Sequence, residues 1–463
     1  MLNQDELKKN DIIKIEIEDM GSEGEGIGHV NGYALFVKDT IPGDVAEVKI
    51  MKMKKSYGYA RLMNLIHPSA FRIEPKCPIA RQCGGCQIQH MDYKEQLRYK
   101  ENKVKNCLTR IGKFSEEYIE SIMEPIIGME VPFYYRNKAQ FPVGRDKEGN
   151  VVIGFYAGRT HSIIDTTNCY IQAEVNEEII KRVKAFIEKY NISTYNEENH
   201  NGLVRHILTR VGFTTGEIMV CLIMNGDDLP HKKEFIESLV DIKGMASICI
   251  NINKEKTNVI LGDTAYTLWG QPYITDYIGD VKYQISPLSF YQVNPVQTKA
   301  LYETALEYAQ LQGDEVVWDL YCGIGTISLF LAKQARRIYG VEIIPEAIED
   351  ARTNAKINGI DNAEFFVGAA EDVLPKKYQE EHIKGDVVVV DPPRKGCDES
   401  LLNTIIKMNP KRIVYVSCDP ATLSRDLKYL SENGYELKRV RPVDQFGHST
   451  HVECAVLMSR VDK

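Results

Sequence analysis

Short hydrophobic runs alternate with polar residues over the first 66 positions, and glycines separate the runs. Residues 12–17, 33–37 and 45–50 are three such runs. A period of two is the pattern of half-buried β-strands, and glycine between the runs favours tight turns. We therefore predict that residues 1–66 form a small all-β barrel.

Residues 67–275 combine strand-like with helix-like segments. The runs at 151–156 and 218–224 are apolar and strand-like, whereas residues 93–112 and 175–190 have the pattern of helices. Strands interrupted by isolated helices are typical of a domain in which both pack together. This part of the chain is predicted to be a central α+β domain.

From residue 276 to residue 463, strands and helices alternate along the chain. Strand-like runs occur at 315–320, 337–342, 363–367, 386–390 and 412–416, and a helix-like segment at 326–335 follows the first of them. Regular alternation of this kind predicts a doubly wound parallel sheet, that is, a Rossmann-like α/β domain. The chain is thus expected to have three domains.

The composition is that of a soluble globular protein. A chain of 463 residues is too long for one hydrophobic core. The net charge of −8 argues against nonspecific affinity for nucleic acid over the whole surface, but it is compatible with a local basic groove. No signal peptide or transmembrane stretch is recognisable. We therefore expect no membrane partner. Because eleven scattered cysteines do not resemble a disulfide scaffold, we also expect the protein to lie in a reducing cytoplasm.

Cys418 follows the apolar run 412–416 at the point where the next helix is expected to begin. Asp419 is a suitable N-cap, and Pro420 fits the first helical position. Ligands of open α/β sheets bind at this edge, and the positive end of a helix dipole favours a thiolate there. Cys418 is therefore a candidate nucleophile. The alternative is a small apolar residue that fills a turn.

A glycine turn and an acidic strand end predict a cofactor site. Gly323 and Gly325 permit a tight turn and close approach of a ligand to the backbone. Glu342, at the end of the next strand, can accept both ribose hydroxyls of an adenosine. Ser328 stands where a nicotinamide-binding fingerprint has its third glycine, and no pyrophosphate cradle is visible. S-adenosylmethionine fits this pattern better than a dinucleotide.

The motif Asp391–Arg394, with sequence DPPR, follows the run 386–390. Methyltransferases that act on exocyclic amines carry an aromatic residue after two prolines, which stacks on the target base. Arg394 occupies that position here. The motif therefore argues against methylation of an exocyclic amine.

Three closely spaced cysteines predict a metal centre. Cys77, Cys83 and Cys86 have the spacing C-x5-C-x2-C, with two glycines in the same loop. Cys169 is the best candidate for a fourth ligand, since Cys107 lies in an expected helix. Thiolate ligands suit an iron–sulfur cluster and zinc alike, so the spacing leaves both open.

Basic and aromatic residues lie together in the predicted barrel. Tyr57 and Tyr59 are surrounded in sequence by five cations, Lys49, Lys52, Lys54, Lys55 and Arg61. This mixture suits single-stranded nucleic acid, although ordinary solvated lysines would give the same pattern. Residues 24–26 and 41–44 make the barrel similar to a TRAM domain, an OB-like RNA-binding fold.

The motifs together resemble the uracil-C5 RNA methyltransferase family over essentially the whole chain. Besides the barrel and the cysteines, the resemblance rests on motifs at 290–294, 319–325, 391–394, 417–420 and 451–453. The tRNA branch of that family lacks the barrel and the cysteine cluster. The resemblance therefore implies the 23S ribosomal RNA branch, in which the cysteines hold a 4Fe-4S cluster.

The resemblance also implies roles for single residues. Contacts to S-adenosylmethionine are implied for Gln292, Tyr321, Glu342 and Asp391. Cys418 would be the nucleophile and Glu453 the general base, with His448 and His451 as rival bases. Asp419 is a departure, because relatives often carry asparagine there and a neighbouring carboxylate opposes a thiolate.

This chemistry requires a nucleophile and a base. Uracil C5 becomes nucleophilic only after a thiolate has added to C6, and a base must then remove the C5 proton. The target uridine must be unstacked, so we expect a loop or single-stranded site in 23S RNA. We also expect the protein to act as a monomer. The alternatives are a tRNA uracil-C5 enzyme, an RNA cytosine-C5 enzyme and a non-catalytic RNA-binding protein.

Overall fold

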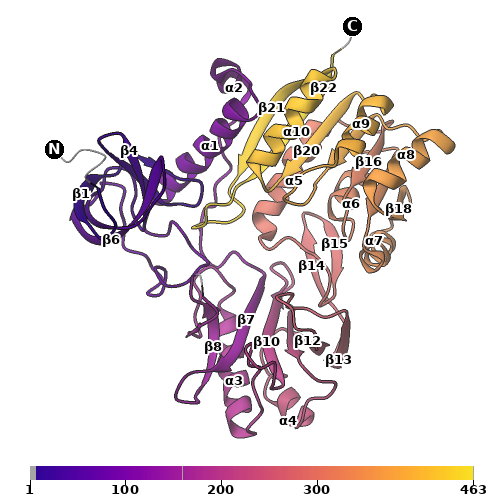
Figure 1. The fold of residues 1–463 in the computed structure, drawn as a ribbon. Coiled ribbons are helices and arrows are strands. Elements are labelled where there is room, and N and C mark those ends of the chain that lie inside the picture. The colour runs from indigo at the N-terminus through magenta and orange to yellow at the C-terminus, as the bar shows by residue number, and fades with distance from the viewer. Residues whose placement is uncertain (1–6, 159, 462–463) are drawn as a thin grey trace. The chain divides into compact units, whose positions relative to one another are not determined.

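The computed structural model describes residues 7–158 and 160–461 (Figure 1). The chain forms two compact units. The described part of the first unit comprises residues 7–103, 157–158 and 446–451, and the second unit contains the rest. The division into three domains at residues 66 and 275 stays a prediction. No helix of the described chain is both long enough and apolar enough to cross a membrane.

Six strands of the first unit form the predicted OB-like β-barrel. They are β1 (Ile12–Glu16), β2 (Asp19–Met20), β3 (Gly26–Val30), β4 (Tyr33–Lys38), β5 (Val45–Met53) and β6 (Tyr57–His67), in the order β1-β5-β6-β4-β3-β2. Alternate residues such as Leu35 and Val37 fill the core, as the period of two predicts. A Cβ at Gly28 would lie 2.2 Å from the carbonyl oxygen of Glu16, so only glycine fits there. The barrel prediction is confirmed.

Helix α1 (Tyr93–Arg110) runs from the first unit into the second. It is followed by the short helix α2 (Glu116–Ile122), whose N-cap Ser115 accepts the N–H of Tyr118. The helical pattern of residues 93–112 correctly predicted α1.

A seven-stranded sheet forms the first part of the second unit. Its strands are β7 (Lys138–Arg145), β8 (Val151–Tyr156), β9 (Ile163–Asp165), β10 (Val204–Val211), β11 (Ile218–Met224), β12 (Met245–Ile252) and β13 (Thr264–Gly270), in the order β13-β12-β11-β10-β7-β8-β9. Helices α3 (Val175–Lys189) and α4 (Lys232–Glu237) pack onto it through residues such as Phe186 and Phe235. The predicted α+β character of this part is confirmed.

A second seven-stranded sheet carries the candidate site. Its strands are β16 (Val316–Leu320), β17 (Arg337–Glu342), β18 (Ala363–Val367), β19 (Val387–Val390), β20 (Arg412–Ser417), β21 (Tyr435–Val443) and β22 (Glu453–Arg460), in the order β18-β17-β16-β19-β20-β22-β21. The first five are parallel, as predicted. Strand β22 instead lies antiparallel between β20 and β21, because the chain turns back from β21 directly into β22 without a crossover helix.

Helices cover both faces of this sheet (Figure 1). One face packs against α5 (Pro295–Ala309), α6 (Thr326–Ala332) and α7 (Pro345–Ile357), and the other against α8 (Ala370–Glu380), α9 (Glu399–Met408) and α10 (Pro420–Glu432). Successive residues of β19 alternate between the two cores: Val389 belongs to the first, Val388 and Val390 to the second. Such a doubly wound arrangement confirms the predicted Rossmann-like domain.

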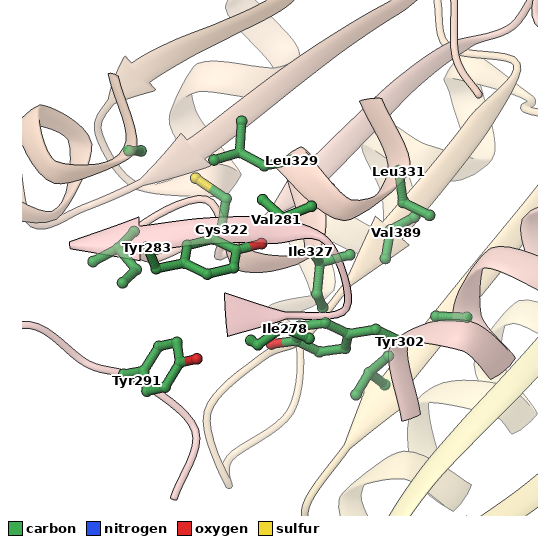
Figure 2. Close-up of a cluster of buried hydrophobic side chains, with 14 of the residues drawn as sticks. Ile278, Val281, Tyr283, Tyr291, Tyr302, Cys322, Ile327, Leu329, Leu331 and Val389 are labelled. Atoms are coloured by element: carbon green, nitrogen blue, oxygen red, sulfur yellow. The ribbon is translucent and has the colours of Figure 1, made fainter. Parts of the chain in front are cut away.

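Two of the buried tyrosines drawn in Figure 2, Tyr283 and Tyr302, support the start of α6. Tyr283 comes from the hairpin of β14 (Ile274–Ile278) and β15 (Val281–Ile285), and Tyr302 from α5. The Tyr283 hydroxyl donates to the carbonyl oxygen of Thr326 at 2.9 Å, and the Tyr302 hydroxyl lies 2.9 Å from that of Thr326. Both tyrosines therefore hold the start of α6, and with it the preceding glycine turn.

Candidate active site

Cys418 lies directly after β20, at the carboxyl edge of the sheet. Asp419 caps α10, since its Oδ1 accepts the N–H of Ala421 at 2.9 Å and that of Thr422 at 3.0 Å. Pro420 is the first helical residue. The strand end, the N-cap and the N1 proline predicted from the sequence are confirmed. The half-buried thiol of Cys418 thus stands between a strand end and a helix start.

Glu453 is the first residue of β22, the antiparallel neighbour of β20. The register pairs Ser417 with Cys454, so Glu453 falls opposite Cys418 at the next position. Only 4% of Glu453 is exposed. The fold therefore brings the predicted nucleophile and the predicted base to one end of neighbouring strands.

The predicted thiolate is wrong for the free protein. Burial, followed by the negative charges of Glu453 and Asp391, raises the pKa of Cys418 to about 11. Arg394 acts in the opposite direction, and Asp419 adds to the increase. Desolvation and nearby carboxylates therefore outweigh the helix dipole, and the free protein holds a neutral thiol.

Three carboxyl groups along this edge have raised pKa values, because burial disfavours their ionised forms. Burial and Asp391 raise the pKa of Glu453 to about 8, whereas Arg394 lowers it. Burial and Asp319 raise the pKa of Asp391 to about 7. Burial raises the pKa of Asp319 to about 7 as well, although the hydroxyl of Ser328 donates to it and lowers the value. An edge of this kind favours a bound cation, because a positive charge would stabilise the ionised carboxylates.

The glycine turn after β16 has the left-handed backbone that the sequence predicts. Gly323 has φ 54° and Gly325 has φ 81°. Tyr321 has φ 70°, an unfavourable value for a non-glycine residue. Glu342 accepts the N–H of Gly323 at 3.2 Å and that of Ile344 at 3.0 Å. The turn, Tyr321 and Glu342 are therefore brought together at the ends of β16 and β17.

Gln292 lies in the segment that precedes α5. Its carbonyl oxygen accepts a hydrogen bond from Asn137 Nδ2 at 2.9 Å, and the residue is 9% exposed. Its side-chain amide makes no hydrogen bond with any residue that the structure describes. Asn294 caps α5 by accepting the N–H of Gln297 at 3.2 Å. The backbone around Gln292 is thus anchored while its amide stays available to a ligand.

The cysteine loop belongs to the first unit. Cys77, Cys83 and Cys86 are half-buried, and the Sγ of Cys83 accepts the N–H of Gly85 at 3.4 Å. Burial raises the pKa of Cys77 and of Cys83. Cys169, the expected fourth ligand, belongs to the second unit. In the part of the chain that the structure describes, no three Cys, His, Asp or Glu side chains are arranged to hold a metal ion, although four thiols suit one chemically.

The two rival bases lie in the first unit. His448 Nδ1 is 3.2 Å from Gln96 Nε2, and the backbone N–H of His448 donates to Gln96 Oε1 at 3.0 Å. His451 donates its backbone N–H to Ser449 Oγ at 3.3 Å. Glu453 is the candidate base that shares the second unit with Cys418.

Arg394 is a site residue whose role the sequence analysis missed. Its charge acts on both Cys418 and Glu453. Its carbonyl oxygen accepts the hydroxyl of Thr422 at 3.1 Å, and Arg425 Nη2 donates to the carbonyl oxygen of Lys395 at 3.0 Å. The Arg394 segment is therefore tied to α10, the helix that Cys418 precedes. The sequence feature that could have indicated this role is the position of Arg394 after two prolines at a strand end.

A Rossmann-like sheet with a glycine turn, an acidic strand end and a carboxyl-lined edge defines a class I S-adenosylmethionine-dependent methyltransferase. Residues 92–461 match the model of the tRNA (Uracil-5-)-methyltransferase family, and residues 6–63 match the TRAM domain. The chain belongs to this family, which confirms the resemblance found in the sequence.

Similar proteins support the same assignment. An uncharacterized RNA methyltransferase of Bacillus cereus is 53% identical over 99% of this chain and 98% of its own, and one of Clostridium tetani is 53% identical over 98% and 97%. The crystal structure of the tRNA (uracil-54, C5)-methyltransferase of Pyrococcus abyssi, in complex with S-adenosyl-L-homocysteine, matches with a TM-score of 0.77 and 29% identity. That match covers 96% of this chain and 99% of the other.

Proposed function

We propose that this methyltransferase converts a uridine of 23S ribosomal RNA into 5-methyluridine through a covalent bond between Cys418 and C6 of the base. The observation that carries the proposal is the register of β20 and β22, which sets Glu453 opposite Cys418. A nucleophile and a base at one site are what methylation at uracil C5 requires. Methylation of an exocyclic amine would need no such nucleophile.

Each residue of the pair has one task. The sulfur of Cys418 bonds to C6, and the electron pair of the C5–C6 double bond moves onto C5 and the neighbouring carbonyl as an enolate. C5 then takes the methyl group that S-adenosylmethionine supplies. Glu453 accepts the C5 proton, the double bond forms again, and the sulfur of Cys418 leaves with its electron pair.

The electrostatics of the site suit the second half of this sequence. Because the pKa of Glu453 is raised to about 8, its carboxylate is a stronger base than an ordinary one. Cys418 must lose its proton to solvent before it attacks, and Glu453, which is mainly protonated at neutral pH in the free protein, must be ionised before it accepts the C5 proton. Arg394 lowers the pKa of both groups and so favours the two ionised forms that the reaction uses.

Aromatic residues of both units support an RNA substrate with an unstacked base. In the barrel, Phe36 of β4 lies beside Tyr57 and Tyr59 of β6, with ring centroids 5.6 to 5.8 Å apart, and the two tyrosines belong to the segment that carries the basic residues. In the second unit, Phe290 is 70% exposed although it is apolar. Of these rings, Tyr59 and Phe290 are exposed, and exposed rings are a usual means of stacking single-stranded bases.

Transfer RNA is the second candidate substrate. The matching structure from Pyrococcus abyssi is a tRNA enzyme, and the match extends over 96% of this chain. A match of this extent includes barrel strands, so the expectation that tRNA enzymes of this family lack the barrel is wrong, and the barrel alone does not select ribosomal RNA. The cysteine motif together with the barrel is what favours 23S RNA, and either substrate is expected in the cytoplasm.

The deciding experiment supplies labelled S-adenosylmethionine with unmodified 23S RNA and, separately, with unmodified tRNA transcripts. We expect label in 23S RNA, mapped to C5 of a uridine. Label in tRNA alone would indicate that tRNA, the second candidate, is the substrate. Label at C5 of cytidine, or no label in either RNA, would contradict it.

We further propose that Cys77, Cys83, Cys86 and Cys169 hold a 4Fe-4S cluster in a chain that acts as a monomer. The donor set supports this, because four thiolates suit such a cluster. No step of methyl transfer is an oxidation or a reduction, so the cluster's role would be structural or in positioning RNA.

A further inference from the structure

Two positive side chains lie at directly paired positions of neighbouring strands in the sheet that β7 to β13 form. Strands β7 and β10 pair antiparallel, and their register places Lys138 directly opposite Arg210. Side chains at paired positions point to the same face of a sheet. Arg136, two residues before Lys138, adds a third positive charge that acts on Lys138.

These cations are not neutralised by the described chain. No carboxylate of residues 7–158 and 160–461 forms an ion pair with any of the three, and the ammonium group of Lys138 makes no hydrogen bond there. Arg210 donates to the carbonyl oxygens of Pro287 and Ser289. The Nε atoms of Arg210 and Arg136 are buried without a partner.

The cations adjoin the segment that carries Gln292. Asn137, between Arg136 and Lys138, donates its backbone N–H to Val293 O at 2.8 Å and its Nδ2 to Gln292 O at 2.9 Å. Arg210 binds the start of the same segment through its two carbonyl acceptors. The positive cluster is thus hydrogen-bonded to the segment that carries Gln292.

This arrangement destabilises the free protein. Like charges at directly opposed positions of an antiparallel pair repel each other. Burial, then Arg210 and Arg136, lower the pKa of Lys138 to about 7. A bound anion would favour the charged form of this half-buried lysine and offset the repulsion from the two arginines.

We infer that Lys138 and Arg136 bind one backbone phosphate of the RNA substrate, beside the loop that carries Gln292. The inference rests on the proposed function, since it takes RNA as the ligand. Lys138 takes up a proton as the phosphate binds, so RNA affinity depends on pH where the affinity of a surface lysine would not. The carboxylate of S-adenosylmethionine is the other candidate anion, and the test separates the two.

The test compares Lys138→Met with Lys147→Met, a control at an exposed lysine in the turn between β7 and β8. Binding of a fluorescent 23S RNA fragment is measured by anisotropy at several salt concentrations. We expect Lys138→Met to weaken binding about tenfold at low salt, the size of one charge-assisted hydrogen bond. The slope of log affinity against log salt should fall by about 0.7, as for one lost phosphate contact. Lys147→Met should change neither.

Two further measurements distinguish phosphate binding by Lys138 from a purely structural role of that residue. The thermal midpoint of Lys138→Met should rise, because the opposed like charges are gone, while its affinity for S-adenosylmethionine stays unchanged. Wild-type RNA affinity should fall as the pH rises above 7, because Lys138 is then neutral in the free protein, and the variant should lack this dependence.

Unchanged RNA affinity in Lys138→Met would overturn the inference, as would a fall in its thermal midpoint. Weaker binding of S-adenosylmethionine would assign the anion to the cosubstrate instead. Methyl transfer by the wild type is measured on the same RNA. If the wild type methylates uridine C5 while Lys138→Met binds RNA normally, only this inference fails, and the proposed function stands.

Discussion

Replacing Glu453 by glutamine should stabilise the fold at neutral and alkaline pH while it stops turnover. Glu453 is buried, and its pKa is raised from 4.5 to about 8 in the folded protein. Between these values the folded state holds a proton that the unfolded state has lost. The stability of the wild type must therefore fall as the pH rises through this window, because ionising the buried carboxyl is unfavourable. Glutamine has no such proton and escapes the loss.

The size of the effect follows from the width of the window. Each pH unit between the two pKa values is worth about 1.4 kcal/mol. The advantage of Glu453→Gln should thus be near zero at pH 4.5, about 3 kcal/mol at pH 7 and at most about 5 kcal/mol at pH 8. Above pH 8 it should stay constant.

Urea denaturation at pH 5, 7 and 8 measures this difference directly. Glu380→Gln, at an exposed position of α8, is the matched control and should shift stability equally little at every pH. An advantage of Glu453→Gln that does not grow with pH would refute the reasoning. So would a loss of stability at pH 8, because it would mean that the ionised carboxylate is well compensated inside the fold.

The same variant tests the chemistry. Glu453→Gln should bind RNA and S-adenosylmethionine, and Cys418 should still attack and methyl transfer should still occur. Elimination should fail, because an amide cannot accept the C5 proton at neutral pH. Methylated RNA linked to protein should accumulate on denaturing gels even with ordinary uridine. Free turnover would move the base role to His448, His451 or water, and binding without methyl transfer would make Glu453 a positioning residue.

Three further outcomes are expected. RNA carrying 5-fluorouridine at the target should form a stable adduct with the wild type and none with Cys418→Ala, and an adduct in that variant would identify another nucleophile. Protein purified without oxygen should be brown with about four irons per chain, and Cys83→Ser should lose the colour, whereas stoichiometric zinc without iron would contradict the cluster. Arg394→Gln should shift the pH profile of methyl transfer to higher pH, because Cys418 and Glu453 lose the positive charge that lowers their pKa values, and an unchanged profile would exclude this role.

The sequence by itself determined the local structure around the candidate site. The run at 337–342 became β17 with the same bounds, and Glu342 ends it as predicted. Asp419 and Pro420 begin α10 as predicted. These features depend on residues within a few positions of one another, through side-chain alternation, capping and the fixed φ of proline.

Tertiary structure alone decided which distant residues meet and how they are charged. No local pattern states that β22 lies antiparallel beside β20, and that register is what sets Glu453 opposite Cys418. The same holds for Lys138 and Arg210, whose opposition depends on the pairing of β7 with β10. The predicted Cys418 thiolate failed for this reason: the helix dipole and the opposing Asp419 are visible in the sequence, but the largest causes of the raised pKa are burial and then Glu453 and Asp391, which the fold brings from other strands. Desolvation and charge proximity are properties of the packed fold, so the sequence could name the reacting residues but not their protonation.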